Sequence, residues 1–190
     1  MKKVIEVYHG SNISVQNPSL SFGRSDADFG CGFYVSTKLE MAEKWACRKK
    51  ASVISKYTLD LQGLEIYEFS PDAEWLEFVI DNRKTKPVSP DMDKYDLIIG
   101  ATADDKLFAT IEQYESGFIS EATAVEVINC MKIGTQICIR TDKGLNNLQY
   151  IGDIHLSPAE IAEIKEQNAK EREQANILTS EIIRKAIAKD

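Results

Sequence analysis

The sequence has few of the residues that build metal sites and disulfide frameworks. It holds four cysteines and two histidines among 190 residues. No two cysteines follow a CxxC spacing, and no histidine stands near a cysteine at the spacing of structural zinc sites. Cysteines this sparse are also atypical of small secreted domains. We therefore expect reduced thiols and no metal site.

Long hydrophobic runs are lacking as well. No apolar run approaches the roughly 20 residues that a membrane-spanning helix needs. Near the N-terminus, Glu6 and His9 interrupt any apolar segment of the kind found in signal peptides. These features predict a protein without a membrane segment that works in a reducing cytoplasm. An effector delivered by a dedicated secretion machine would have the same features.

The chain also lacks an excess of basic charge. Lys and Arg number 23 against 30 Asp and Glu, which gives a net charge of −7. Strong non-specific binding to nucleic acid relies on a basic face that neutralises phosphates, so this balance argues against it. The 43% hydrophobic and 28% charged residues are ordinary for a globular protein and exclude a disordered chain. The length indicates one domain with a short appendage.

Local patterns predict strands and helices that alternate without a regular βαβ rhythm, which favours the α+β class. The expected strands are 4–8, 31–36, 53–61, 64–69, 95–100, 135–140 and 148–152, with the third and fourth joined at Gln62-Gly63. The expected helices are 38–50, a helix that opens at 70–72 and ends at 83, 106–114 and 120–131.

A capping box with proline at the first helical position, Ser157-Pro158-Ala159-Glu160, predicts a helix that continues to the C-terminus. The sequence thus divides into a domain at 1–155 and a helical extension at 156–190. The extension is polar in its middle and apolar near its end. It either packs on the same domain or offers a surface to a protein partner.

The two histidines stand in different settings. His155 comes just before the capping box, where a structural or surface role is expected. His9 ends an apolar, β-branched run and is followed at once by Gly10 and Ser11. Because glycine has no Cβ, the backbone at Gly10 can approach a ligand closely. His9 is therefore the histidine we expect to bind or catalyse.

A second feature combines glycines with aromatic residues. Gly30 and Gly32 stand one residue apart and are followed by Phe33 and Tyr34. This arrangement can form a recess lined by backbone with one flat wall. The alternative is a bulged turn before a strand, with Tyr34 in the core.

Together, Tyr8-His9-Gly10-Ser11 and Phe29-Gly30-Cys31-Gly32-Phe33-Tyr34 resemble the diphtheria-toxin and poly(ADP-ribose)-polymerase branch of the ADP-ribosyltransferases. In that branch an HG(S/T) strand and a later G-x-G-x-Y strand line the NAD pocket, and a further aromatic residue follows eleven positions on, here Trp45. The resemblance covers about residues 4–50. The chain is also similar to a little-characterised bacterial family near these enzymes, through 95–100 and 136–139.

The resemblance implies a split mixed β-sheet of ADP-ribosyltransferase type, with flanking helices, a C-terminal helix and an NAD cleft between the halves of the sheet. NAD would be a substrate, cleaved at its nicotinamide–ribose bond, with ADP-ribose passed to a protein, nucleic acid, small molecule or water. His9 would bind a ribose hydroxyl, Gly10 the carboxamide, and Tyr34 and Trp45 the faces of the nicotinamide ring. The implied NAD-binding residues are His9, Gly10, Ser11, Gly32, Tyr34, Ser36 and Trp45.

The implied catalytic residues are His9, Tyr34 and Gln136. Enzymes of this family usually carry a Glu at the start of a late strand, and the best match here, 136–140, begins with Gln136. A glutamine can bond the ribose 2′-OH but carries no charge to stabilise an oxocarbenium ion. We expect Gln136 to face the cleft, and Gln136→Glu to raise NAD cleavage. Asp104 or Asp105 could instead supply a carboxylate.

Three other interpretations remain open. One is a non-catalytic module that binds NAD or ADP-ribose on the same fold. Another is the arginine-modifying toxin branch, although His9 stands where that branch has an arginine. The third is a partner-binding protein that works through its C-terminal helix. A toxin-like or phage-defence role is an expectation by analogy with the family.

Overall fold

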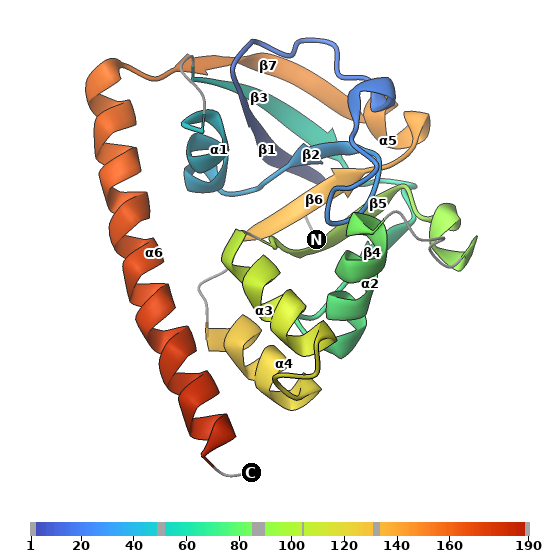
Figure 1. The fold of residues 1–190 in the computed structure, drawn as a ribbon. Coiled ribbons are helices and arrows are strands. Elements are labelled where there is room, and N and C mark those ends of the chain that lie inside the picture. Colours follow the sequence, from blue (N-terminus) through green and yellow to red (C-terminus); the bar gives the residue numbers. More distant parts are fainter. Residues whose placement is uncertain (1–2, 49–51, 85–89, 104, 131–133, 189–190) are drawn as a thin grey trace.

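Two β-sheets form the centre of the structure, and helices cover their outer sides (Figure 1). The computed structural model describes residues 3–48, 52–84, 90–103, 105–130 and 134–188. The strands are β1 (Val4–Ser11), β2 (Phe33–Val35), β3 (Val53–Asp60), β4 (Ile66–Glu68), β5 (Leu97–Ala101), β6 (Thr135–Ile139) and β7 (Leu148–His155). The α-helices are α1 (Leu39–Ala46), α2 (Ala73–Arg83), α3 (Asp105–Glu115), α4 (Glu121–Cys130), α5 (Asp142–Asn146) and α6 (Pro158–Ile187).

The two sheets differ in strand number and in strand direction. One has the order β1-β3-β7 and is antiparallel. The other has the order β2-β6-β5-β4 and is mixed, because β4 runs parallel to β5. One isolated bridge, between Tyr8 and Ser36, connects β1 with β2 and so joins the two sheets. The expected α+β class with a mixed sheet, flanking helices and a C-terminal helix is confirmed.

Strand alternation divides the core into layers. Val7 of β1 and Phe33 of β2 belong to a cluster that fills the space between the sheets. On the outer side of the mixed sheet, Trp75 of α2 belongs to a second cluster, which also takes in residues of α3 and α4. Ile137 and Ile139 point into the first cluster, and Cys138 points into the second. The expectation that Ile137 and Ile139 turn away from the Gln136 face is therefore confirmed.

Most expected elements are present with shifted ends. The two strands expected on either side of Gln62-Gly63 form as β3 and β4, but they lie in different sheets. Gly63 takes a φ of 77° in the turn between them, and β4 pairs with β5 instead of folding back on β3 as a hairpin. Helix α5 is an element that the sequence patterns do not predict. The expected helix ends at Lys50 and Met131 lie outside the described residues.

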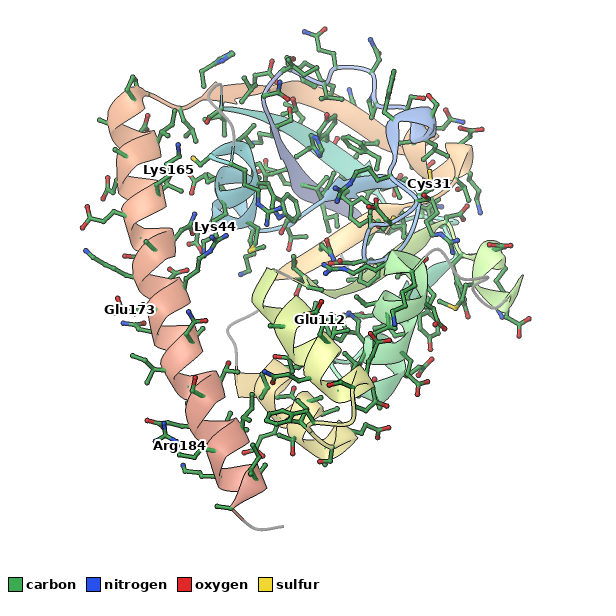
Figure 2. The ribbon with its side chains drawn as sticks, in the orientation of Figure 1. Cys31, Lys44, Glu112, Lys165, Glu173 and Arg184 are labelled. Atoms are coloured by element: carbon green, nitrogen blue, oxygen red, sulfur yellow. The ribbon has the colours of Figure 1, made fainter. Side chains whose placement is uncertain are left out.

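Helix α6 runs along one side of the molecule and contacts both of its halves (Figure 1). Ser157 and Glu160 form the expected capping box at its start. Near the middle of α6, Glu171 forms an ion pair with Lys44 of α1, which is labelled in Figure 2. The distance from Lys44 Nζ to Glu171 Oε2 is 2.6 Å. Nearer its end, the helix packs on α4, and Ile182 is the buried residue of α6. The extension thus packs on the domain that precedes it. No helix within the described ranges is both long and apolar enough to cross a bilayer.

Candidate functional site

Strands β1 and β2 part immediately after their single bridge. Tyr8 donates its N–H to Ser36 O at 2.8 Å, and Ser36 returns a 2.9 Å bond to Tyr8 O. Backbone groups two residues apart on a strand point to the same edge, so the N–H and C=O of Gly10 also point toward β2. The described pairing of β1 with β2 ends before Gly10. We call the place where this pairing ends, between Gly10 and Tyr34, the notch.

His9 lies at the notch and is held in one tautomer. Its ring packs on Phe33, with ring centroids 4.5 Å apart. Its Nδ1 lies 2.7 Å from the carbonyl oxygen of Tyr34. A carbonyl can only accept, so Nδ1 carries the proton and Nε2 is left with a lone pair. Burial lowers the pKa of His9, which keeps the ring neutral at pH 7. His9 therefore carries a hydrogen-bond acceptor at Nε2.

Gly10 is required where helix α1 crosses β1. A Cβ at this position would collide with the backbone oxygen of Ala42 and lie 2.8 Å from the N of Ala46. The glycine therefore lets α1 lie directly on the strand beside the notch. Trp45, on the same helix, is half-buried. The described contacts do not place its indole against the ring of Tyr34.

The side chain of Tyr34 lies on the outer face of the mixed sheet. Its hydroxyl accepts from the N–H of Phe29 at 3.0 Å and donates to the carbonyl of Gly30 at 2.7 Å. The rings of Tyr34 and Phe29 stack with centroids 6.4 Å apart. Burial raises the pKa of the Tyr34 phenol, so it remains protonated. Tyr34 thus fastens the segment before β2 to the sheet.

Gln136 sits in a buried polar cluster rather than at an open surface. The residue is 4% exposed, and Nε2 donates to Asp28 at 2.7 Å and to Ala101 O at 3.3 Å. The Asp28 carboxylate also accepts from Nε and Nη2 of Arg83 at 2.9 and 2.6 Å and from the N–H of Ala103 at 2.8 Å. Distant parts of the chain thus meet at Asp28. Gln136 is therefore more enclosed than the sequence analysis expected.

The partners of Gln136 fix the direction of its amide. A carboxylate can only accept, so the NH₂ group must face Asp28 and the oxygen must point away from it. In the part of the chain that the structure describes, nothing donates a hydrogen bond to Oε1 of Gln136. That oxygen is not among the fully buried unpaired atoms either. Oε1 of Gln136 is therefore an acceptor that no donor among the described residues occupies.

The other expected site residues lie around these groups. Ser36 is buried and donates to Thr135 O at 2.9 Å, which ties the end of β2 to the start of β6. Ser11 bonds the carbonyl of Ile13, and a Cβ on Gly32 would lie 2.7 Å from the oxygen of Ile139. Both therefore have local structural roles.

The two proposed sources of a carboxylate are placed differently. Asp104 lies outside the described residues, and Asp105 is the first residue of α3. The carboxylate that does reach Gln136 belongs to Asp28, which the sequence analysis missed. Asp28 stands in a loop, 55 residues from its partner Arg83, so no local spacing could reveal the pair. No group of three or more His, Cys, Asp or Glu in the described ranges could hold a metal ion.

The comparisons with known proteins place the chain in a family. The model of DUF3990, described as a protein of unknown function, matches residues 5–150. The chain belongs to the DUF3990 family. The match runs from β1 to the first residues of β7, includes the notch and ends before α6. No curated protein and no solved structure matches the chain.

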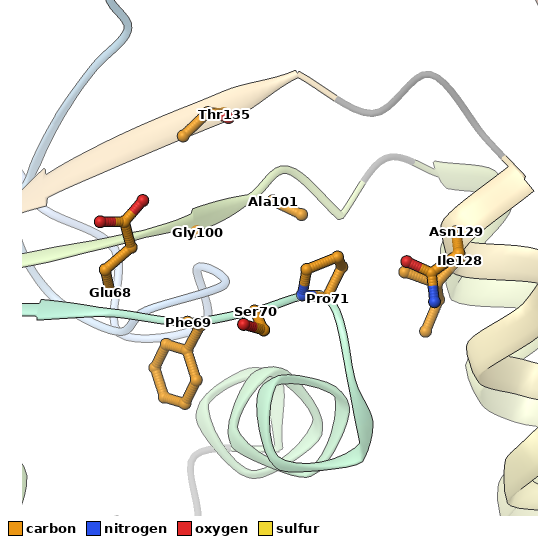
Figure 3. A pocket seen from close by; sticks show the side chains of 9 residues that line it. All are labelled: Glu68, Phe69, Ser70, Pro71, Gly100, Ala101, Ile128, Asn129 and Thr135. Atoms are coloured by element: carbon orange, nitrogen blue, oxygen red, sulfur yellow. The ribbon is translucent and has the colours of Figure 1, made fainter.

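A groove opens beside the start of β6 in this DUF3990 chain (Figure 3). It has a volume of about 560 Å³. Its walls come from the ends of β4 and β5, the segment after β4, α4 and the first residue of β6. The described lining residues are Glu68, Phe69, Ser70, Pro71, Gly100, Ala101, Ile128, Asn129 and Thr135. The carbonyl oxygen of Ala101 accepts a hydrogen bond from Gln136, and that of Thr135 accepts one from Ser36. The groove therefore adjoins the site.

Proposed function

We propose that this protein is an NAD-dependent ADP-ribosyltransferase that cleaves the nicotinamide–ribose bond. The notch between Gly10 and Tyr34 is the observation that carries the proposal. It combines a backbone donor and acceptor at Gly10, a neutral histidine whose Nε2 has a lone pair, and half-buried aromatic side chains on β2 and α1. These are the groups that the resemblance assigns to the NAD pocket.

Each group in the notch has a counterpart in NAD. The carboxamide of nicotinamide needs one donor and one acceptor, which the N–H and C=O of Gly10 would supply. The flat ring would lie between Tyr34 and Trp45. Nε2 of His9 would accept a bond from a hydroxyl of the adenosine ribose. Ser11, Gly32 and Ser36 would shape the surrounding backbone.

The proposed reaction breaks the C1′–N bond, and nicotinamide leaves with the electron pair. An oxocarbenium-like ribose remains, and the acceptor attacks C1′ and releases its proton to water. Oε1 of Gln136 would accept a hydrogen bond from the ribose 2′-OH. The negative end of the Gln136 amide dipole would then point toward the cation. Asp28 would hold the amide in this direction. His9, Tyr34 and Gln136 are therefore the proposed catalytic set.

A second candidate function is a module that binds NAD or ADP-ribose without cleaving it. The observation that favours it is the charge state of the buried cluster. Gln136 is uncharged, and the carboxylate of Asp28 is compensated by Arg83 at 2.6 Å. A site without a free negative charge stabilises an oxocarbenium ion weakly. Binding without turnover would then be the outcome.

The first test measures NAD binding by titration calorimetry. The parent protein should bind NAD, and His9→Gln should weaken binding by about tenfold, or about 1.4 kcal/mol, because Nε2 is lost. His155→Gln is the matched control, because His155 is exposed and lies on β7, which β3 separates from β1. Equal affinity of the parent and His9→Gln would exclude the notch as the NAD site.

The second test separates turnover from binding. NAD labelled in its adenylate part is incubated with the protein and a cell lysate, and the products are digested separately with nuclease and protease. Label released by only one of these enzymes identifies the acceptor class. Free nicotinamide without attached label indicates water as the acceptor. NAD binding without nicotinamide release would support the binding module. A toxin-like or defence role in a bacterial cytoplasm would require modification of an acceptor. We therefore propose this role only together with the transferase function.

A further inference from the structure

We propose that the groove beside the start of β6 binds a positively charged group, a guanidinium or an ammonium, on the molecule that receives ADP-ribose. This inference rests on the proposed transferase function for its biological meaning. The groove's preference for a cation rests on its own lining. The two can therefore be tested separately.

The groove is close enough to the reacting centre to hold an acceptor. Gln136, where C1′ of NAD would lie, bonds Ala101 O at 3.3 Å, and Ala101 lines the groove. Thr135, the residue before Gln136, lines it as well. The side chains of Thr135 and Gln136 point to opposite faces of β6, so the groove reaches Gln136 through the backbone of Ala101.

The groove presents oxygen acceptors, since the hydroxyls of Ser70 and Thr135 can accept as well as donate. The side chain of Glu68 is exposed and makes no hydrogen bond or ion pair with the rest of the described chain. In Figure 3 its carboxylate points toward Thr135. Asn129 donates its amide group to Val125 O at 3.0 Å, and no donor among the described residues bonds its oxygen. None of the described lining residues is a lysine or arginine. A ligand with several N–H donors and a positive charge fits this set of atoms.

The groove also has apolar walls for the stem of such a group. Pro71 and Ile128 flank the opening in Figure 3, and Phe69 lies at its edge. The methylene stem of an arginine or lysine side chain packs well on surfaces of this kind while its charged head meets the oxygens. The volume of about 560 Å³ falls within the usual range for ligand sites, roughly 300–1,000 Å³.

With a guanidinium acceptor the atoms of the reaction balance without another reactant. The C1′–N bond to nicotinamide breaks, and nicotinamide leaves as a neutral molecule with the electron pair. One guanidinium nitrogen forms the new bond to C1′. The nitrogen gives up one proton, which passes to water.

The first experiment tests the cation site without NAD. Butylguanidinium and its neutral analogue butylurea are titrated into the ¹⁵N-labelled protein, and the amide signals of Gly100, Ala101 and Thr135 are followed by NMR. Butylguanidinium should shift these signals, and butylurea should bind about five- to tenfold more weakly. Glu68→Gln should weaken butylguanidinium binding by a similar factor, because one charged hydrogen-bond partner is removed. Glu65→Gln, an exposed residue just before β4, is the matched control and should have no effect.

The second experiment connects the groove to transfer. With NAD present, Glu68→Gln should lower transfer to butylguanidinium by about the same factor and leave the affinity for NAD unchanged. Equal binding of butylguanidinium and butylurea, or equal binding by the parent and Glu68→Gln, would overturn the inference. Displacement of butylguanidinium by NAD would also overturn it, because NAD would then occupy the groove. Cation binding without nicotinamide release would refute the transferase and leave the cation site standing.

Discussion

Replacing Gln136 with glutamate should destabilise the protein strongly at neutral pH. In the native structure Nε2 of Gln136 lies 2.7 Å from the Asp28 carboxylate, and the exposed fractions of the two residues are 4% and 7%. The substitution would remove this hydrogen bond and place two carboxylates side by side. Two like charges about 4 Å apart repel by about 4 kcal/mol at an effective dielectric constant of about 20. This cost opposes the gain in NAD cleavage that the sequence alone predicts for Gln136→Glu.

The variant can avoid this repulsion by protonating the new Glu side chain, but this lowers the free energy of unfolding by a similar amount. The folded state would raise the pKa of the new carboxyl above its unfolded value of about 4.3, so the fold must retain a proton that the unfolded chain releases. At about 1.36 kcal/mol per pH unit, this costs about 3.7 kcal/mol at pH 7 and about 1 kcal/mol at pH 5. The loss of stability should therefore be large at pH 7 and shrink as the pH falls toward about 4.3.

Urea denaturation of parent and variant at pH 7 and pH 5 measures this difference directly. Gln149→Glu on the exposed side of β7 is the control and should change stability by no more than about 0.5 kcal/mol. The double variant Asp28→Asn/Gln136→Glu should recover part of the loss, because one carboxylate and one amide again face each other near Arg83. If Gln136→Glu were as stable as the parent at pH 7, the contact between Asp28 and Gln136 would be refuted. If the double variant also released nicotinamide faster than the parent, the missing charge would be the limit on catalysis.

Three further outcomes are expected. Gly10→Ala should cost about 2–3 kcal/mol in urea denaturation because its Cβ meets the backbone of α1, whereas Gly152→Ala, with no atom within 4 Å of its added Cβ, should cost less than about 0.5 kcal/mol. Tyr34→Phe should lose about 1–3 kcal/mol and speed hydrogen exchange at the amide of Phe29, and unchanged exchange there would contradict the role given to the phenol. Burial lowers the pKa of His9, so below pH 6.5 the unfolded chain takes up a proton that the fold resists, and the parent should lose more stability between pH 7 and pH 5 than His9→Gln does.

Local patterns in the sequence predicted most of the elements correctly. The capping box at Ser157 needs only four neighbouring residues, and it starts α6 where expected. Alternation within one strand predicted that Ile137 and Ile139 turn away from Gln136. His9 and Tyr34, matched through motifs 25 residues apart, are in direct contact in the structure. Each of these features depends on periodicity or on a short motif, which a single sequence displays.

The partner of each strand and the surroundings of Gln136 were decided only by the tertiary structure. Sequence order suggested that the strands around Gln62-Gly63 are neighbours. A strand can, however, pair with any other strand that the fold brings beside it, and β4 pairs with β5. Gln136 and Arg83 meet Asp28 across separations of 108 and 55 residues. A buried carboxylate is stabilised only when distant donors converge on it, and folding the whole chain is what brings them together. The sequence by itself therefore determined the elements and the motif at the notch, and the tertiary structure determined that Gln136 faces Asp28.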